Sequence, residues 1–472
     1  MTAPQRLARS PRRRVGTTRI LQLGGIAIVL IAVAAAARQP ATVAGRRADP
    51  TFAQDVAPIF YKNCTACHHT GGLAPFSLVE YDSATPYLSE MYEAVSQGKM
   101  PPWHAEGPHG MFRNDRRLSD ADKATILKWL DTGAKPGDLS KLPPRPTYPS
   151  TWTMAGGPPD LVVSMKDDFE VPATGTVEYQ YFEIPTNITE EKWVQAIEIQ
   201  PGAREVVHHV LVYAKVPPPP AGAQPAAAPA AAGTPQAPRP ANTPLFVRNR
   251  DQGLPPDPPR LDTLHPPPRQ LGPLIGSTAP GTNVVEFPAG TALRLRPGTI
   301  LTFQMHYTTH GEAHKDRTSV GFRFAKEMPD EEIYAASFVN GAFTIPAGAK
   351  DVAVPAEIGV TQPVKIWGLL PHTHLRGVRW QYKLVKPDST SEIILDVPRY
   401  DFNWQTYYLF AKPLEIPTGA KITSMAWYDN SSSNKSNPNP SVDVKWGDQT
   451  WEEMQYTGFL YSVPSRRLRP AK

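Results

Sequence analysis

The residues best suited to chemistry begin with a Cys-x-x-Cys-His motif, Cys64-Thr65-Ala66-Cys67-His68, which holds the only two cysteines of the chain. Two thiols at this spacing, followed at once by a histidine, are the attachment signal for c-type haem. The thiols bond to the porphyrin and the histidine ligates the iron. A redox dithiol would need a thioredoxin-like context, and a zinc site would need two further ligands nearby. The motif therefore predicts a covalent haem c.

A second axial ligand for this haem is expected from a later loop. Met100 lies in a Pro-rich stretch, Gly-Lys-Met-Pro-Pro-Trp, 32 residues after His68. A thioether ligand suits a haem that carries electrons at raised potential, so we predict Met100 as the ligand opposite His68. The competing candidates in the same region are Met91, His104, His109, Met111 and His69.

Two helices are expected to hold this motif. Apolar residues at Phe52, Val56, Ile59 and Phe60 mark one helical face that runs directly into the motif. A second helix begins near residue 118 with a Ser-x-x-Asp cap and ends near residue 133. The order of helix, Cys-x-x-Cys-His, methionine loop and helix resembles a small class I cytochrome c, and we place this all-α domain at residues 48–138.

Five further histidines lie in strand-like segments: His208, His209, His306, His372 and His374. Residues two apart on a strand project from the same face, so His372 and His374 can hold one metal ion together. Adjacent residues project to opposite faces. His208 and His209 can therefore share a metal only if a β-bulge or a change of ligating nitrogen turns one of them. The histidines predict metal binding in a β-rich part of the chain.

The elements around these histidines have the pattern of antiparallel β-structure. After a Pro-rich linker at residues 139–160, short segments rich in β-branched and aromatic residues alternate with Pro, Gly and Asn, which indicates sandwiches or jelly rolls. Residues 217–280 interrupt the pattern with 19 of the 54 prolines. We expect this stretch to be a disordered or polyproline-like insertion in the first β-domain.

The charge of the chain is concentrated in a leader. Residues 1–47 hold nine arginines and no acidic residue, and residues 20–37 are uncharged and end in four alanines. This is the pattern of a signal peptide or an N-terminal membrane anchor. It predicts export to the periplasm or the extracytoplasmic face of a bacterial-type membrane, with membrane association if the segment is retained. Residues 48–472 carry 40 basic against 44 acidic side chains, so charge gives no support for nucleic-acid binding.

Four segments of the β-rich region occur in an order that resembles a known family. They are VHHVLVY at 207–213, QMHYTTHG at 304–311, PHTHLRG at 371–377 and WEEMQYTGFLYS at 451–462. The family is the copper type II, ascorbate-dependent monooxygenases, which include peptidylglycine α-hydroxylating and dopamine β-monooxygenase. The resemblance spans about residues 158–465. It implies two all-β antiparallel jelly-roll sandwich domains, here 161–335 and 336–472, with one copper each.

The resemblance also implies a ligand set for each copper. His208, His209 and His306 match the three-histidine copper that transfers electrons. His372, His374 and Met454 match the copper at which O2 is activated. Such a division is chemically sensible, because imidazoles hold both Cu(I) and Cu(II), whereas an added thioether favours Cu(I).

Some positions depart from the family. The animal enzymes have several disulfides, and this chain has no cysteines for them. In the peptidylglycine enzyme three residues help to hold a peptide carboxylate. Here those positions are Leu370, Tyr456 and Gly458, so peptide amidation is not supported.

Together these features predict an exported haem- and copper-dependent monooxygenase that hydroxylates a small-molecule or peptide substrate with O2. The haem would pass electrons to the three-histidine copper and from there to the copper at His372, His374 and Met454, supplementing or replacing ascorbate or another external reductant. One alternative is a non-catalytic electron-transfer protein whose β-module binds copper or docks a partner. A second alternative is an enzyme that uses only one of the two copper sites.

Overall fold

The structure is a computed structural model that describes residues 49–72, 74–148, 152–216, 245–253, 265, 268, 271–278 and 284–465. The chain divides into two compact units, Met1–Ala48 and Asp49–Lys472, and the fold below is that of the second. The leader predicted at residues 1–47 lies outside the described residues. Among the residues described, no helix is both long enough and apolar enough to cross a membrane.

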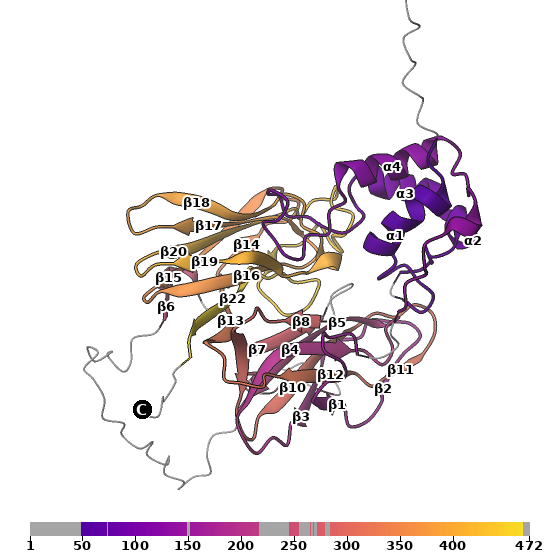
Figure 1. The fold of residues 1–472 in the computed structure, drawn as a ribbon. Coiled ribbons are helices and arrows are strands. Elements are labelled where there is room, and N and C mark those ends of the chain that lie inside the picture. Colours follow the sequence, from indigo (N-terminus) through magenta and orange to yellow (C-terminus); the bar gives the residue numbers. More distant parts are fainter. Residues whose placement is uncertain are drawn as a thin grey trace, which may run out of the picture. The chain divides into compact units, whose positions relative to one another are not determined.

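The helices that flank the Cys-x-x-Cys-His motif form one group (Figure 1). They are η1 (Phe52–Val56), α1 (Ala57–Asn63), α2 (Tyr81–Ala84), η2 (Thr85–Tyr87), α3 (Leu88–Ser96) and α4 (Asp120–Asp131). The predicted face of the first helix is buried against Trp129 of α4, with Phe52 and Phe60 both in ring contact with that indole. The predicted cap of α4 is confirmed, because Ser119 Oγ accepts a hydrogen bond of 3.1 Å from Asp122 N–H. Beyond this group lie the short turns η3 (Leu139–Lys141), η4 (Arg250–Gln252) and η5 (Phe402–Trp404).

The rest of the described chain is mostly β-structure, as predicted. Its strands are β1 (Leu161–Ser164), β2 (Phe169–Val171), β3 (Gln180–Pro185), β4 (Lys192–Gln200), β5 (Val207–Lys215), β6 (Phe246–Arg248), β7 (Leu274–Thr278), β8 (Val284–Glu286), β9 (Thr291–Leu295), β10 (Ile300–Tyr307), β11 (His314–Asp316), β12 (Ser319–Phe324), β13 (Glu331–Val339), β14 (Thr344–Ile345), β15 (Val352–Val360), β16 (Val364–His372), β17 (Gly377–Val385), β18 (Ser391–Val397), β19 (Tyr408–Ile416), β20 (Lys421–Tyr428), β21 (Val444–Lys445) and β22 (Tyr456–Pro464).

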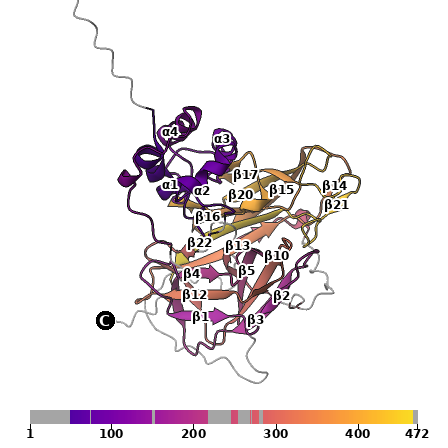
Figure 2. The same cartoon turned by 90° about the vertical axis from the view of Figure 1, so that its right-hand side faces the viewer.

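One nine-stranded sheet runs through both predicted β-domains. Its order is β1-β12-β4-β9-β13-β22-β16-β19, with β8 added on β4, and all pairs are antiparallel except β13 with β9. In the first domain a four-stranded sheet, β3-β10-β5-β7, packs on the β4 and β12 end (Figure 2). Alternating residues such as Val210 and Val212 of β5 meet Ile197 and Ile199 of β4 in this core. The result is a β-sandwich whose core lies between the two sheets.

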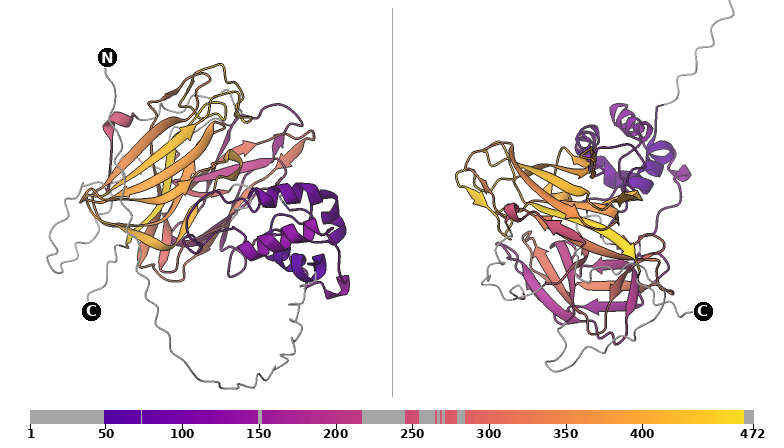
Figure 3. Two further views of the ribbon diagram at one scale, coloured as in Figure 1. Left: turned by 90° about the horizontal axis from the view of Figure 1, so that it is seen from above. Right: turned by 90° about the vertical axis from the view of Figure 1, so that its left-hand side faces the viewer.

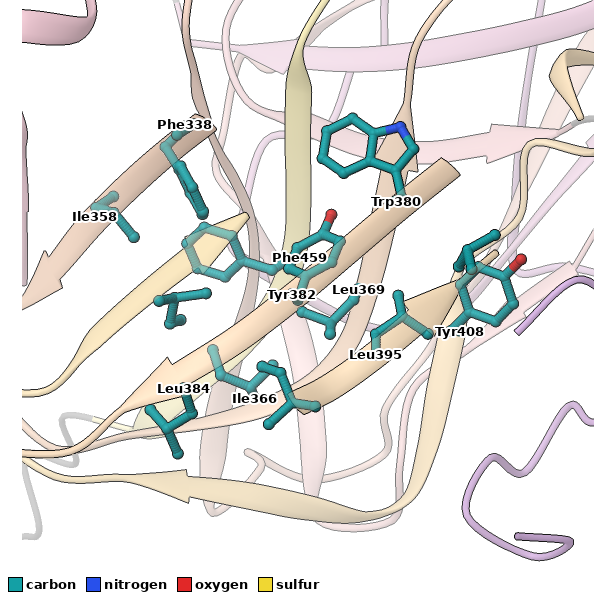
Figure 4. Close-up of a cluster of buried hydrophobic side chains, with 14 of the residues drawn as sticks. Phe338, Ile358, Ile366, Leu369, Trp380, Tyr382, Leu384, Leu395, Tyr408 and Phe459 are labelled. Carbon is teal, nitrogen blue, oxygen red and sulfur yellow. The ribbon is translucent and has the colours of Figure 1, made fainter. Parts of the chain in front are cut away.

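A second sandwich forms from the other half of the same sheet. The five-stranded sheet β18-β17-β20-β15-β6 packs against β13, β22, β16 and β19 (Figure 3). Trp380 and Tyr382 of β17, Leu369 of β16, and Phe459 of β22 are all fully buried in this core, as the close-up in Figure 4 shows. The aromatic and β-branched composition that predicted strands therefore also supplies the core that holds the sheets together.

The strand pairing corrects two predictions, one about a domain boundary and one about an insertion. The boundary between residues 335 and 336 falls inside β13, which pairs along its whole length with β22 and, at Glu331 and Glu332, with β9. Most of the insertion predicted at 217–280 lies outside the described residues, but its described part contains two short strands, so the prediction was wrong there. There β7 pairs with β5, while β6 pairs with β15 of the second sandwich. Both stretches follow a proline, and their side chains Phe246 and Ile275 pack against the cores of the two sandwiches.

The predicted cytochrome domain and linker also share packing with the β-structure. Trp103 and Phe112 belong to the core of the second sandwich, where both rings contact Tyr408. The end of the predicted linker is held by the buried carboxylate of Glu198, which accepts hydrogen bonds from the backbone N–H groups of Thr153 and Met154. Residues 103–112 are thus held by the second sandwich.

Candidate metal centres

The three histidines His208, His209 and His306 come together on neighbouring strands. His209 pairs with His306 across β5 and β10, and the register then shifts so that Tyr307 pairs with Val207. His208 is therefore the extra residue of a β-bulge, which is the irregularity that a shared site for adjacent histidines requires. The bulge turns both rings toward His306.

The geometry of this cluster fits a metal ion. His209 Nδ1 lies 3.1 Å from His208 Nδ1 and 3.3 Å from His306 Nδ1. One potential ligand atom from each ring lies within 4.8 Å of the others, and among the described residues this is the only group of three or more His, Cys, Asp or Glu side chains that meets so closely. A ring nitrogen carries at most one proton, so His209 Nδ1 cannot donate to both neighbours. A cation would be satisfied by all three lone pairs at once.

Burial keeps these imidazoles in the form that binds metals. It lowers the pKa of His306 to about 3, with a further contribution from His208. Burial also lowers the pKa of His209 well below its ordinary value, and the neighbouring histidines act in the same direction. Neutral imidazoles are the ligating form, so these rings need lose no proton to bind copper at neutral pH.

The second pair, His372 and His374, lies at and just beyond the end of β16. Their rings are 5.2 Å apart and nearly perpendicular. His372 Nδ1 is 2.6 Å from Gln405 Oε1, and the amide of Gln405 is oriented by its own donation to Phe402 O. His374 Nδ1 lies 3.2 Å from Glu452 O. Since both acceptors require Nδ1–H, each ring presents its Nε2 as the metal-ligating nitrogen.

Met454 faces the same cavity as these two histidines. The cavity has a volume of about 310 Å³ and is lined by His372, His374, Met454 and also by His209 of the first cluster. The structure therefore brings the second predicted ligand set to one space and places part of the first set on its wall. Leu370 and Tyr456, two of the positions that depart from the family, line this cavity too.

A buried acid ties the ligand-bearing segments of the second site together. Glu453 is fully buried, and its carboxylate accepts hydrogen bonds from His374 N–H at 2.8 Å, Arg376 N–H at 2.6 Å and Met454 N–H at 3.3 Å. Arg376 is itself 1% exposed and donates through Nε to Asn430 at 2.8 Å. Burial raises the pKa of Glu453 to about 8, a rise that the N–H donors and Arg376 oppose.

A second buried acid, Asp316, connects the two chain segments next to the three-histidine cluster. Asp316 accepts hydrogen bonds from the N–H groups of Gly202 and Ala203 and from the hydroxyls of Tyr307 and Thr318. It thereby joins the turn before β5 to the end of β10, where the bulge lies. The three-histidine cluster is held from outside by hydrogen bonds as well as by the sheet.

In the Cys-x-x-Cys-His motif, the ring of His68 has one nitrogen held by a backbone carbonyl. The ring Nδ1 lies 3.2 Å from Phe76 O, so Nδ1 carries the proton and Nε2 can ligate iron. Both thiols are free, and burial raises the pKa of Cys64 to about 12 and the pKa of Cys67 as well. A redox dithiol needs a lowered thiol pKa, so the structure disfavours that alternative.

The axial-ligand candidates differ in what already holds them. Met91 is buried in the helical core, His69 stacks on Tyr148 at 4.0 Å, and His109 is paired with Asp115. Met100 follows α3 and is held by its backbone N–H, which donates to Ala94 O. Two other candidates, His104 and Met111, are half-buried beside the second sandwich. The choice of Met100 stays a prediction.

Four residues that touch the sites gave no sequence signal: Phe402, Gln405, Asp448 and Glu453. Phe402 and Gln405 come from the turn before β19, where the sequence has no strand or helix period. Asp448 and Glu453 lie between β21 and β22, outside any strand. Only Glu453, one position before a predicted ligand, could have been singled out from the sequence.

Asp448 gives a stability test that depends on pH. It lines the cavity, and burial, followed by repulsion from Glu452, raises its pKa to about 6. A carboxyl with a raised folded-state pKa favours the protonated form, so its ionisation costs stability as pH rises from about 4 to 6. Asp448→Asn should therefore stabilise the protein by about 2 kcal/mol at pH 7.5 and by much less at pH 4. Urea unfolding at both pH values measures this, and an equal gain at both would contradict it.

Comparisons with known proteins do not assign the chain to a family. No family model matches the sequence, and no curated protein matches it. Among solved structures, the major capsid protein P2 of bacteriophage PM2 aligns with 65% of this chain and 98% of its own length, at 8% identity and a TM-score of 0.27. A structure of infectious bursal disease virus, Gx strain, aligns with 68% of this chain and 72% of its own, at 10% identity and a TM-score of 0.18. Likenesses at such TM-scores carry no argument about fold or function.

Proposed function

We propose that this protein is an exported, haem- and copper-dependent monooxygenase. The observation that carries the proposal is the meeting of His208, His209 and His306 at a β-bulge, with His209 on the wall of the cavity that holds His372, His374 and Met454. In this proposal the helical group is a class I cytochrome c domain and the two sandwiches are copper jelly rolls. Residues 1–47 would deliver the chain across a membrane.

The residues of the chain have separate tasks in this proposal. His208, His209 and His306 would hold one copper, and His372, His374 and Met454 would hold the other. Cys64 and Cys67 would anchor the haem, with His68 and Met100 as the residues that would hold its iron. When bound, these groups supply one-electron transfer and O2 activation. The cavity between the ligand sets would exclude bulk water and admit substrate.

Hydroxylation fixes the electron count. A substrate C–H bond, one O2, two protons and two electrons give a C–OH bond and one water. The electrons must come from outside, one at a time, from ascorbate or another reductant. The haem held by Cys64, Cys67 and His68 would be the entry point for these electrons, and the copper sites would receive them.

The experiment that tests the activity is anaerobic reduction of the full chain, loaded with haem and copper, followed by ¹⁸O2 and a panel of small molecules and peptides. Incorporation of one ¹⁸O atom per product molecule supports a monooxygenase. Reoxidation without a labelled product from any compound favours the competing function, an electron-transfer protein whose β-module binds copper. A chain that is active with only one ligand set intact would instead support a one-site enzyme.

The electron entry is tested by removing the haem. In a Cys64→Ala/Cys67→Ala chain loaded with copper, we expect ascorbate to reduce Cu(II) more slowly than in the haem-containing chain, because the haem is the proposed entry point for electrons. Stopped-flow loss of the Cu(II) signal measures the rate. Equal rates in the two proteins would exclude the haem from the relay.

Gln405 provides a test of the second copper site. Its acceptor oxygen orients His372, and loss of such a partner typically lowers metal affinity 10–100-fold. Gln405→Ala should therefore weaken copper binding at this site by at least about tenfold, whereas Gln405→Glu keeps an acceptor and should retain most of the affinity. Competition with a coloured Cu(I) chelator measures both. Unchanged affinity in the alanine variant would exclude this role.

A further inference from the structure

One short stretch of chain touches both histidine sets. Residues 399–408, here called the contact loop, include the turn η5 and end at the first residue of β19. Phe402, at its centre, is 9% exposed. Its ring is stacked on His208 of the three-histidine cluster, with centroids 5.6 Å apart and an interplanar angle of 14°. The same ring meets His374 of the second set edge-on, at 6.2 Å and 86°.

Neighbours of Phe402 also contact the second set. Gln405 accepts a hydrogen bond from His372. The Tyr400 hydroxyl is bonded to Thr373 N–H at 3.2 Å and Thr373 O at 3.0 Å, in the residue that separates the two histidines of the second set. The contact loop therefore contacts three of the six predicted copper ligands, His208, His372 and His374, and the backbone between the last two.

Both ends of the contact loop are anchored outside the sites. Arg399 donates to Gln97 O after α3, and Asn114 donates to Tyr407 O at 2.7 Å. Tyr408 packs edge-on against Trp103, with centroids 5.1 Å apart. Because the ends are fixed and Phe402 is buried, a change in the position of its ring must be taken up by the histidine rings beside it.

We propose that Phe402 couples the two copper sites, so that filling the three-histidine site strengthens copper binding at His372, His374 and Met454. The inference rests on the proposed function, because it requires that both sites bind copper. A metal bound to His208 would fix the plane of that imidazole ring. Phe402 stacks on this ring, so its position would be fixed as well. Phe402 would then hold His374, which its ring also contacts, in place. Coupling of this kind is reciprocal, and typical values change affinity about 5–150-fold. Phe402 acts here as a positioning residue.

The test compares the second site with and without the first. His306→Ala removes one ligand of the three-histidine site. The ring of His306 contacts His208 and His209 and not Phe402, so the change leaves the Phe402 contacts in place. Affinity at the second site is measured in the full chain by competition with a Cu(I) chelator, and the geometry of its Cu(II) form is followed by electron paramagnetic resonance. With Phe402 present, His306→Ala should weaken the second site at least about fivefold and shift its spectrum. With Phe402→Ala, the same change should have less than a twofold effect.

Two further variants separate positioning from folding. Phe402→Tyr keeps an aromatic ring and should restore the coupling. Phe410→Leu removes a ring of the same size that is buried on β19 against Phe112 and makes no ring contact with a histidine, so it should lower the melting temperature and leave the coupling intact.

The outcomes are distinct. If both sites bind copper and the second site has the same affinity with and without His306, the coupling is overturned and the proposed function stands. If the fivefold effect persists in Phe402→Ala, the assignment to Phe402 is overturned. If neither site binds copper, both the coupling and the proposed function fail.

Discussion

Replacing His209 by alanine is expected to remove one of two coppers from the protein. His209 Nδ1 is the nitrogen that contacts both other rings of the three-histidine cluster. Without it two imidazoles remain, on different strands, and neither is positioned by the other. Loss of an outer partner of a ligand already costs 10–100-fold in affinity, so loss of the central ligand should cost more than about 100-fold.

Copper per chain, measured after gel filtration, should fall from two to one in His209→Ala. The remaining Cu(II) spectrum should be that of the second site. His310→Ala is the matched control, because His310 is exposed and outside both ligand sets, and it should keep two coppers. Two coppers in His209→Ala would mean that the cluster is not a copper site.

Replacing Glu453 by alanine is expected to have the largest effect on stability. The change leaves the buried N–H groups of His374 and Arg376 without their acceptor. An unsatisfied buried donor costs about 1–3 kcal/mol, and the change creates two of them. We expect Glu453→Ala to lower the free energy of unfolding by about 2–6 kcal/mol.

The second copper site should be lost with it, since the carboxylate joins the backbone of His374 to that of Met454. Urea unfolding and copper content measure the two effects. Glu415→Ala is the control, because Glu415 is exposed on β19, and it should change stability by less than about 0.5 kcal/mol. A Glu453→Ala protein as stable as this control would show that the carboxylate does not hold the site together.

The sequence predicted those features of the sites and the helices that depend only on residues close together in the chain. The spacing of His372 and His374 predicted that both would face one cavity, as they do, although only His372 lies in β16 and His374 follows its end. The need for a bulge at His208 followed from the alternation of side chains along a strand, and the register shift after His306 supplies it. The cap at Ser119 could be predicted because it involves only residues within one helical turn.

Long-range contacts could not be predicted in this way. Phe402 and Gln405 lie in a turn whose sequence has no periodic pattern. Their contacts with the predicted ligands depend on β5 and β16, which are distant in sequence. The pairing of β6 with β15 depends on a stretch that returns to the other sandwich after many prolines. The boundary within β13 was missed because a strand shared by two sandwiches has the same alternating pattern as a strand that belongs to one.

Haem and copper content of the full chain tests the central claim most directly. The protein would be produced in a host able to attach haem c, supplied with copper and purified by gel filtration. Covalent haem is measured by the pyridine haemochrome spectrum and copper by elemental analysis. The account predicts one haem and two coppers per chain. A folded chain that carries its haem and binds no copper would contradict it.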